Sequence, residues 1–157
     1  MIRARGFSLL ELLVVLALLG WLVTLALPAF QEQILRARRV VATTALWELM
    51  LRQEQYFTRH RRYAMDLSSL GVGHGDHFYL DARGRRQEEP GIYRISMAQG
   101  EAQTVRLLAT AVGRQARDHR CARLWLDSTG AHGSVTREAL ADAAESVPAA
   151  GKSACWP

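Results

Sequence analysis

The pattern of apolar and polar positions divides the chain into three regions, and the first is the most distinct. Residues 7–30 contain one charged side chain, Glu11, among 24 positions. As a helix this segment would be about 36 Å long at ~1.5 Å per residue, and the hydrocarbon core of a bilayer is roughly 30 Å thick. The pattern therefore predicts a transmembrane helix. A carboxylate at the centre of such a helix costs ~2.5–3.5 kcal/mol, so Glu11, although near the helix end, indicates a functional partner.

After residue 30 the pattern becomes amphipathic without an obvious break. Apolar residues recur at intervals of three, four and seven, which is the spacing of one helix face. One continuous helix from residue 7 to about residue 59 is predicted, with its second half packed on a globular domain. Trp47 falls near the polar side, either at the edge of the core or at a contact with another subunit. The expected apolar face comprises Ile34, Leu35, Val41, Ala42, Ala45, Leu46, Leu49, Met50, Tyr56 and Phe57, and the expected polar face comprises Arg36, Arg39, Glu48, Arg52 and Gln55.

Residues 60–91 show little periodicity and are expected to form loops with short elements. Within them, residues 63–71 suggest a helical turn that ends at a glycine, and residues 78–80 suggest a short strand. The charged segment 83–89 is expected to be a solvated hairpin or loop.

Alternating apolar residues predict an antiparallel sheet in the second half of the chain. Strands are expected at 92–97, 104–112 and 121–127, and the connections between them are too short for helical crossovers. One face of this sheet would pack on the amphipathic half of the helix, which gives an α+β domain. The alanine-rich segment 136–145 predicts a short helix capped by Thr136.

Basic residues are concentrated in a few runs. The net charge is +5, and 19 of the 20 basic residues are arginine. Without Arg3 and Arg5 the excess is small, so contact with phosphate or anionic lipid is allowed but not required. Arg36, Arg38 and Arg39 follow the apolar segment and are expected to meet lipid headgroups or acidic residues of neighbours. Two further arginine runs and the aromatic residues beside them would form either a DNA-binding surface or a solvated face: Arg59, Arg61, Arg62, Arg83, Arg85, Arg86, Tyr63 and Phe78.

No arrangement of residues indicates catalysis. The sequence has neither a phosphate-binding glycine loop nor a Gly-x-Ser-x-Gly elbow. Residues 127–130, Asp-Ser-Thr-Gly, are not the aspartic-protease triplet, which needs its glycine one place earlier. His74, Asp76 and His77 are candidate metal ligands in a glycine-rich turn, but further ligands at recognisable spacing are missing. We therefore expect no enzyme, no cofactor and no metal site.

Cys121 and Cys155 are the two cysteines of the chain. His119 can share a strand face with Cys121, so a thiol nucleophile is allowed by geometry. Behind a membrane-targeting segment, however, the two thiols are expected to meet an oxidising compartment and to form a disulfide. Such a bond would close a 35-residue segment and would stabilise the fold by roughly 3–4 kcal/mol on the chain-entropy model.

A short basic leader precedes the apolar segment. Arg3 and Arg5 should hold this end in the cytoplasm and send the C-terminal domain outward. A plain uncleaved signal anchor would explain the apolar run, but neither the Gly-Phe pair that precedes it nor its carboxylate. Residues 6–15, Gly-Phe-Ser-Leu-Leu-Glu-Leu-Leu-Val-Val, resemble the class III signal of type IV pilins and the related pseudopilins.

This resemblance implies a processing step and roles for several residues. In this family a prepilin peptidase cuts after the glycine, here between Gly6 and Phe7, and Phe7 becomes N-methylated. Glu11 corresponds to the glutamate at the fifth mature position, and Gly20 and Pro28 correspond to the helix-weakening glycine and proline. Cleavage creates an ammonium group on Phe7, which can pair with Glu11 of a neighbouring subunit or of the same chain.

Two further segments are similar to PilE-like minor pilins, namely residues 59–67 and the terminal Cys-Trp with its disulfide region. The resemblance implies the type IV pilin fold and a minor pilin that supports pilus biogenesis, twitching motility or adhesion. The expected domains are the leader 1–6, the transmembrane and assembly segment 7–30, and the globular domain 31–157. A type II secretion pseudopilin and a DNA-binding pilin for natural transformation are the alternatives.

The resemblance also implies partners and a location. The expected partners are other pilin subunits, the prepilin peptidase and methyltransferase, the inner-membrane assembly platform and membrane lipid, with nucleic acid as a further alternative. Before assembly the subunit would cross the bacterial inner membrane once, with its C-terminal domain in the periplasm. After assembly it would belong to the extracellular pilus.

Overall fold

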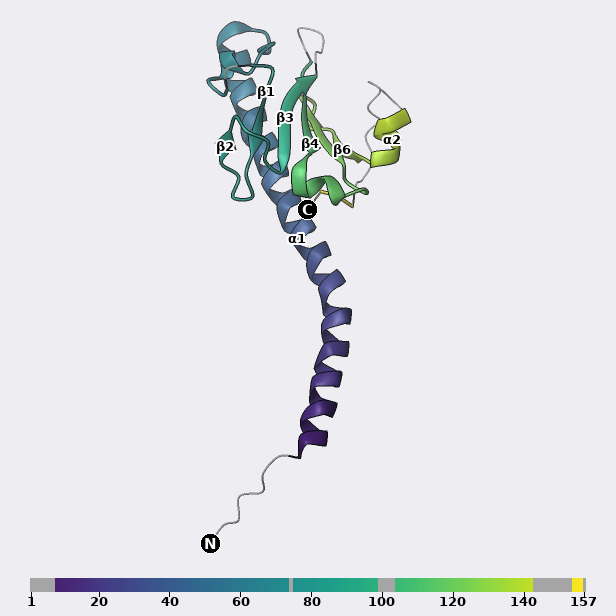
Figure 1. Cartoon of the computed structure of the whole chain (residues 1–157). Helices are drawn as coiled ribbons and strands as arrows, with labels where there is room; N and C mark the ends of the chain where they lie inside the picture. The colour runs from purple at the N-terminus through teal and green to yellow at the C-terminus, as the bar shows by residue number, and fades with distance from the viewer. Residues whose placement is uncertain (1–7, 74, 99–103, 143–153, 157) are drawn as a thin grey trace. The chain divides into compact units, whose positions relative to one another are not determined.

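The computed structural model of the protein describes residues 8–73, 75–98, 104–142 and 154–156. The chain forms two compact units, residues 1–34 and residues 35–157, and each is described by itself. Helix α1 (Leu9–His60) contributes residues to both units (Figure 1).

The first unit consists of the N-terminal part of α1. Its large apolar side chains, from Leu9 to Phe30, are exposed wherever the structure describes them, so this part of the helix has no core of its own. The helix continues through Gly20 and Pro28. A proline inside a helix removes one backbone hydrogen bond, and the flanking bonds keep the helix continuous at this point. The prediction of one uninterrupted helix is confirmed from Leu9 to His60, while its predicted start at Phe7 lies outside the described residues.

Among the described residues of the second unit, six strands form one antiparallel sheet. Their order in the sheet is β2-β1-β3-β4-β5-β6, so the chain mostly adds each strand beside the preceding one (Figure 1). The strands are β1 (His77–Leu80), β2 (Arg86–Gln87), β3 (Tyr93–Ala98), β4 (Arg106–Ala111), β5 (Arg123–Asp127) and β6 (His132–Val135).

The three predicted strands are confirmed as β3, β4 and β5, and the short strand at 78–80 is confirmed as β1. The segment 83–89, expected to be a solvated hairpin or loop, forms a hairpin in which β2 pairs with β1. The pattern missed β6. Strand β6 contains Gly133, which is a weak strand former, and the reason for the glycine lies in its neighbour. A Cβ atom at Gly133 would approach the Trp125 ring to 2.9 Å, so only a residue without a side chain fits beneath the indole.

The core lies between one face of the sheet and the second half of α1. Along β4, buried and half-buried residues alternate, as expected when one sheet face is covered. The fold is therefore α+β, as predicted. From α1 the buried apolar residues are Ala42, Leu46, Leu49 and Met50, and from the three central strands they include Tyr93, Ile95, Leu107, Ala109, Leu124 and Leu126.

The prediction for one residue of the polar face is wrong. Arg39 is only 7% exposed, whereas we expected it to meet lipid headgroups or acidic neighbours. Its guanidinium donates two hydrogen bonds to the Asp118 carboxylate, at 2.7 and 2.8 Å. Asp118 lies 79 residues further along the chain, so no local pattern could reveal that Arg39 has a partner inside the domain.

Short elements connect the helix to the sheet. The predicted turn at 63–71 contains the 3-10 helix η1 (Ser68–Leu70), and Gly71 ends it in the left-handed conformation with φ 68°. Buried Gln53 holds this connection against α1, because its side chain both donates to the Ala64 carbonyl and accepts from the Ala64 N–H.

The predicted C-terminal helix is confirmed as α2 (Arg137–Asp142). The Thr136 hydroxyl oxygen accepts a hydrogen bond from the Ala139 N–H, which is the expected cap. Residues 143–145 of the predicted helix lie outside the described part of the chain.

Candidate assembly helix and charged surfaces

The processing site and its carboxylate lie at the start of α1. Gly6 and Phe7 are outside the described residues, so cleavage and methylation stay predictions. Glu11 is exposed in the first helical turn, and within the described part of the chain it makes no hydrogen bond or ion pair. By length and composition, α1 can cross a membrane. The partner of Glu11 also stays a prediction.

A buried polar network ties α1 to the disulfide region. The Asp118 carboxylate, only 2% exposed, accepts from Arg39, from the Gln115 side-chain amide at 3.1 Å and from the Cys121 backbone N–H at 3.3 Å. Gln115 lies on the 3-10 helix η2 (Gly113–Arg117) and also donates to the Leu35 carbonyl at 3.3 Å. Because a buried ion pair needs satisfied hydrogen bonds to be stable, these extra donors matter as much as the charge.

The Asp118 carboxylate also acts on a neighbouring strand residue. Burial raises the pKa of the Tyr93 phenol, and the negative charge of Asp118 raises it further. Tyr93 therefore stays neutral over the physiological pH range.

Cys121 and Cys155 form a disulfide, with 5.8 Å between their Cα atoms. The bond leaves neither sulfur available as a nucleophile, so the alternative of a reactive Cys121 thiol is excluded in this state. It also brings the end of the chain back to the sheet, where the Trp156 indole N–H donates to the Gly133 carbonyl at 2.8 Å.

Trp156 belongs to an aromatic cluster with Trp47 and His132. The Trp47 ring centroid lies 6.3 Å from that of Trp156 and 6.5 Å from that of His132, both in edge-on geometry. Trp47 remains 48% exposed and is not part of the buried core. It therefore lies at the edge of the core, and a contact with another subunit stays a prediction.

The two arginine runs differ in the hydrogen bonds and ion pairs that their side chains make. Arg59, Arg61 and Arg62 are exposed at and after the end of α1, and no hydrogen bond or ion pair is recorded for their side chains within the described residues. On the β1–β2 hairpin, the Arg85 guanidinium donates to Asp81 at 2.8 Å and the Arg86 guanidinium donates to Glu48 at 2.7 Å, while Arg83 is exposed.

The aromatic residues expected beside these arginines are not available to a ligand. Tyr63 is 8% exposed and its hydroxyl donates to the Glu54 carboxylate at 2.8 Å. Phe78 is 6% exposed, and the Arg86 guanidinium lies 5.6 Å from the centre of its ring. The part of the DNA-binding alternative that included these two rings in the surface is therefore wrong, because both belong to the core.

Glu48 brings the arginine run of the β1–β2 hairpin to the face of α1 that carries the arginines near the end of the helix. Its Oε1 atom accepts from Arg52 at 3.2 Å and from Arg86 at 2.7 Å. Arg59 follows Arg52 by seven residues, so both project from one face of the helix. The contact with Glu48 joins Arg86 of the hairpin to Arg52, which sequence reasoning placed on the polar helix face without connecting it to either arginine run. The basic face is defined as Arg52, Arg59 and Arg86, and the exposed Arg61 and Arg62 follow the end of α1.

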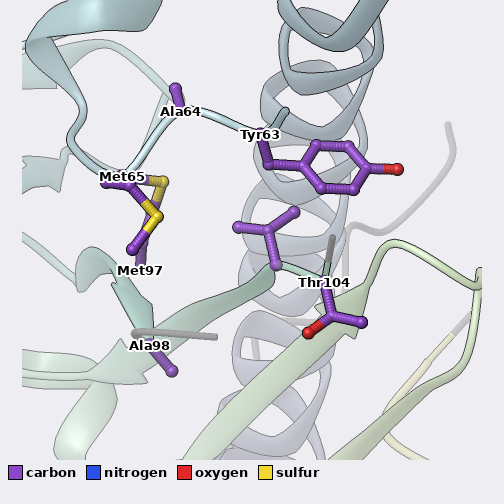
Figure 2. Close-up of a pocket in the computed structure, with 7 residues that line it drawn as sticks. Tyr63, Ala64, Met65, Met97, Ala98 and Thr104 are labelled. Carbon is purple, nitrogen blue, oxygen red and sulfur yellow. The ribbon is translucent and has the colours of Figure 1, made fainter. Parts of the chain in front are cut away.

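Neither the candidate metal ligands nor a small hollow near β3 suggests a bound group. His74 is outside the described residues, and the Asp76 carboxylate pairs with the His77 imidazole at 2.6 Å, which lowers the pKa of Asp76. The hollow between β3 and the segment after α1 has a volume of about 10 Å³, which is room for one water molecule at most. Its lining residues are Tyr63, Ala64, Met65, Met97, Ala98, Thr104 and Val105 (Figure 2).

Comparison with known proteins adds the family. Residues 28–125 match the family described as "Type IV minor pilin ComP, DNA uptake sequence receptor", and residues 1–27 match the "Prokaryotic N-terminal methylation motif". The chain belongs to the ComP-type minor pilins of the type IV pilin family. A pilin relative is the "Type IV major pilin protein PilA" of Myxococcus xanthus (strain DK1622), which is 32% identical over 101 residues. The match covers 64% of this chain and 41% of PilA, so the chain spans less than half of that relative's length.

Membership in this family confirms the predicted pilin fold and the methylation-type signal. Pilins are structural proteins, and no feature of the chain gives positive evidence of catalysis. The family description adds one theme that the sequence had offered only as an alternative, namely contact with DNA.

Proposed function

We propose that this protein is a minor subunit of a type IV pilus. In this proposal the leader 1–6 is removed, residues 7–30 anchor the subunit in the inner membrane with its C-terminal domain in the periplasm, and the domain 31–157 reaches the surface of the extracellular fibre. The observation that carries it is the exposed apolar half of α1, with one carboxylate in its first turn, joined to a disulfide-closed α+β domain.

Assembly would give the exposed helix the covering that it lacks within the chain. Packing of apolar helices from several subunits removes their side chains from lipid, and it places Glu11 in a medium of low dielectric constant. A carboxylate is stable there only when it is paired. The N-methylated ammonium group of Phe7 on a neighbouring subunit is the proposed partner, and the pair would fix the axial register of the fibre. The other proposed partners are the prepilin peptidase and the assembly platform.

Mass spectrometry of sheared fibres from the native host tests this function. A peptide that begins with methylated Phe7, present in the fibre fraction, is the expected result. If the mature chain is found only in the cell envelope, and its deletion abolishes protein secretion while leaving fibres normal, the pseudopilin alternative replaces the proposal.

DNA uptake is a second candidate function, favoured by the description of the matching family and by the basic face. Because Tyr63 and Phe78 are buried, the contacts would be mainly between arginines and phosphates rather than between rings and bases. Such binding falls steeply with salt. Three phosphate contacts would weaken binding roughly 40-fold between 50 and 200 mM salt, at a slope of about −0.9 per contact.

Binding of a labelled DNA duplex to the full chain in a nonionic detergent tests this candidate. The variant R59Q/R61Q/R62Q is expected to lose most of the binding. A matched control removes the same charge elsewhere, at Arg114, Arg117 and Arg120, which are also exposed. Absence of binding at 50 mM salt, or equal losses in the two triple variants, would reject DNA uptake through this face.

A further inference from the structure

The last turns of α1 and the segment after it enclose a polar pocket. Its volume is about 280 Å³, and it is lined by Arg52, Gln55, Tyr56, Arg59, His60, Ser69 and Leu70. Five of these residues belong to α1 and follow one another at the spacing of a single helix face, which explains how one helix can supply most of the lining. The pocket lies entirely within the second unit.

The charge inside the pocket is positive. Arg59 and His60 are exposed and have no recorded hydrogen bond or ion pair within the described residues, although the His60 ring stacks on Tyr56 at 4.2 Å. Arg52 is partly engaged, because it donates to the Leu70 carbonyl at 3.5 Å and to Glu48 at 3.2 Å.

The nearby carboxylates do not neutralise this charge. Glu48 is shared between Arg52 and Arg86, so one negative charge faces two guanidinium groups. Asp66 keeps its negative charge, and its oxygens already accept hydrogen bonds from the Ser68 hydroxyl and from both the N–H and the hydroxyl of Ser69. The guanidinium groups of Arg52, Arg59 and Arg86 still outnumber the two carboxylates. The C-terminal end of α1 contributes a partial negative charge, but this is smaller than the full charges of Arg52 and Arg59.

We propose that this pocket binds a phosphate group. Guanidinium groups present paired N–H donors that match two oxygens of an oxyanion at a time. Two such groups, together with the His60 imidazole and the Gln55 amide, supply more donors than the two oxygens of a carboxylate accept, and they fit the three or four oxygens of a phosphate. Leu70 and the Tyr56 ring are the only apolar lining, so an apolar ligand gains little.

Two ligands can supply the phosphate group, a free phosphate ion and the backbone of a nucleic acid. Assignment to a nucleic acid rests on the DNA-uptake candidate, and it is supported by Arg86, which Glu48 places beside Arg52. The phosphate site itself does not depend on that candidate, because its donors come from the pocket alone.

Titration of the full, disulfide-intact chain in dodecyl maltoside micelles tests the site. Inorganic phosphate is added at constant ionic strength against chloride, and binding is followed by the backbone amide resonances of the pocket residues. Arg59→Gln is expected to weaken phosphate binding at least fivefold, a threshold set by the loss of one of two guanidinium forks. Arg114→Gln is the matched control, since Arg114 is exposed but neither lines the pocket nor belongs to the DNA-binding candidates, and it should change binding less than twofold.

Because Arg59 is exposed, its replacement leaves the core intact, and unchanged resonances outside the pocket verify this. Absence of saturable phosphate binding, or equal weakening by the two variants, would overturn the site.

A labelled duplex, titrated in parallel, separates this proposal from DNA uptake. If Arg59→Gln weakens phosphate binding but no duplex binds at low salt, the pocket stands with free phosphate as its source and DNA uptake is rejected. If the duplex binds and R59Q/R61Q/R62Q weakens it, while Arg59→Gln matches Arg114→Gln with phosphate, DNA uptake stands and the pocket is rejected.

Discussion

The two halves of α1 place a charged residue in opposite situations. In the second half, Arg39 is buried, and its partner Asp118 comes from the same chain with two hydrogen bonds. In the first half, Glu11 lies among exposed apolar side chains, and the described residues offer it no partner. The second half is thus complete within one subunit, whereas the first half, on the proposed function, becomes complete only in an assembly.

The largest expected effect on assembly comes from Glu11→Ala. Membrane insertion should be unchanged or improved, because a charge leaves the apolar segment. Incorporation into fibres should fall at least tenfold, since the ammonium group on a neighbouring Phe7 loses its partner; tenfold corresponds to about 1.4 kcal/mol. Immunoblots of membrane and sheared-fibre fractions measure both quantities. Glu32→Ala, which removes a carboxylate just after the apolar segment, is the control, and normal incorporation of Glu11→Ala would refute the pairing.

The buried pair offers the converse test. Asp118→Ala should lower the free energy of unfolding by about 3–5 kcal/mol, because Arg39 stays buried and loses the carboxylate that accepts two of its hydrogen bonds. The double variant Arg39→Met with Asp118→Leu should be less destabilised than Asp118→Ala, since neither charge remains. Denaturant unfolding of the chain in detergent, with the exposed Asp76→Ala as control, gives the comparison. If the single and double variants lose equal stability, the charge is not the cause.

Removal of the disulfide should have the next largest effect. Replacement of Cys121 and Cys155 by serine should lower the free energy of unfolding by about 3–4 kcal/mol, because the unfolded chain is no longer restricted by the loop. Limited proteolysis should then cut the residues between α2 and the C-terminus first, while α1 is unaffected. An equally resistant tail in the double variant would show that other contacts hold it.

The smallest effect is expected at an exposed charge. Arg85→Ala removes a surface partner of Asp81 and should shift the unfolding midpoint by less than about 2 °C. The pKa of Asp81 is held below its usual range, first by the Arg85 backbone N–H and then by the Arg85 side chain. A lowered carboxyl pKa stabilises the fold at neutral pH, and this contribution is lost as the pH falls through the lowered value.

The Arg85→Ala variant keeps the backbone donor, so most of this acid sensitivity should remain. Asp81→Asn should remove it. Unfolding midpoints measured between neutral and acidic pH test both expectations, and loss of the pH dependence in Arg85→Ala would show that the side chain dominates.

Local features of the chain were predictable from the sequence, and features that depend on distant partners were not. The helix, its apolar segment and the strands β3 to β5 follow from periodicity within short windows. Arg39 was misassigned because its partner lies 79 residues away. The two arginine runs were grouped as one candidate surface, but Arg52 was not included, because the Glu48–Arg86 contact that links it to the hairpin spans 38 residues. Strand β2 has only two residues, and β6 has one β-branched residue and a glycine, so its composition does not indicate a strand.

Tyr63 and Phe78 show a different limit. Both residues lie close to arginines in the sequence, and residues in a charged run are usually expected to be exposed. In β1, however, every second residue faces the core. Phe78 and Leu80 are therefore buried, whereas His77 and Tyr79 are half-buried. The Tyr63 ring is buried in the apolar core, and its hydroxyl donates a hydrogen bond to the Glu54 carboxylate. An amphipathic side chain can therefore lie beside charged residues and still belong to the core.

The hydrogen bond from Trp156 to Gly133 has a consequence for how subunits can be crowded together. Strand β6 is one edge of the described sheet, and an open edge exposes backbone N–H and C=O groups that can pair with a strand of another molecule. The indole occupies one acceptor on that edge, and the disulfide one residue earlier keeps it in place. The opposite edge, β2, is only two residues long. Subunits held at high density in a membrane or a fibre would therefore meet through side chains, and their sheets would not join edge to edge.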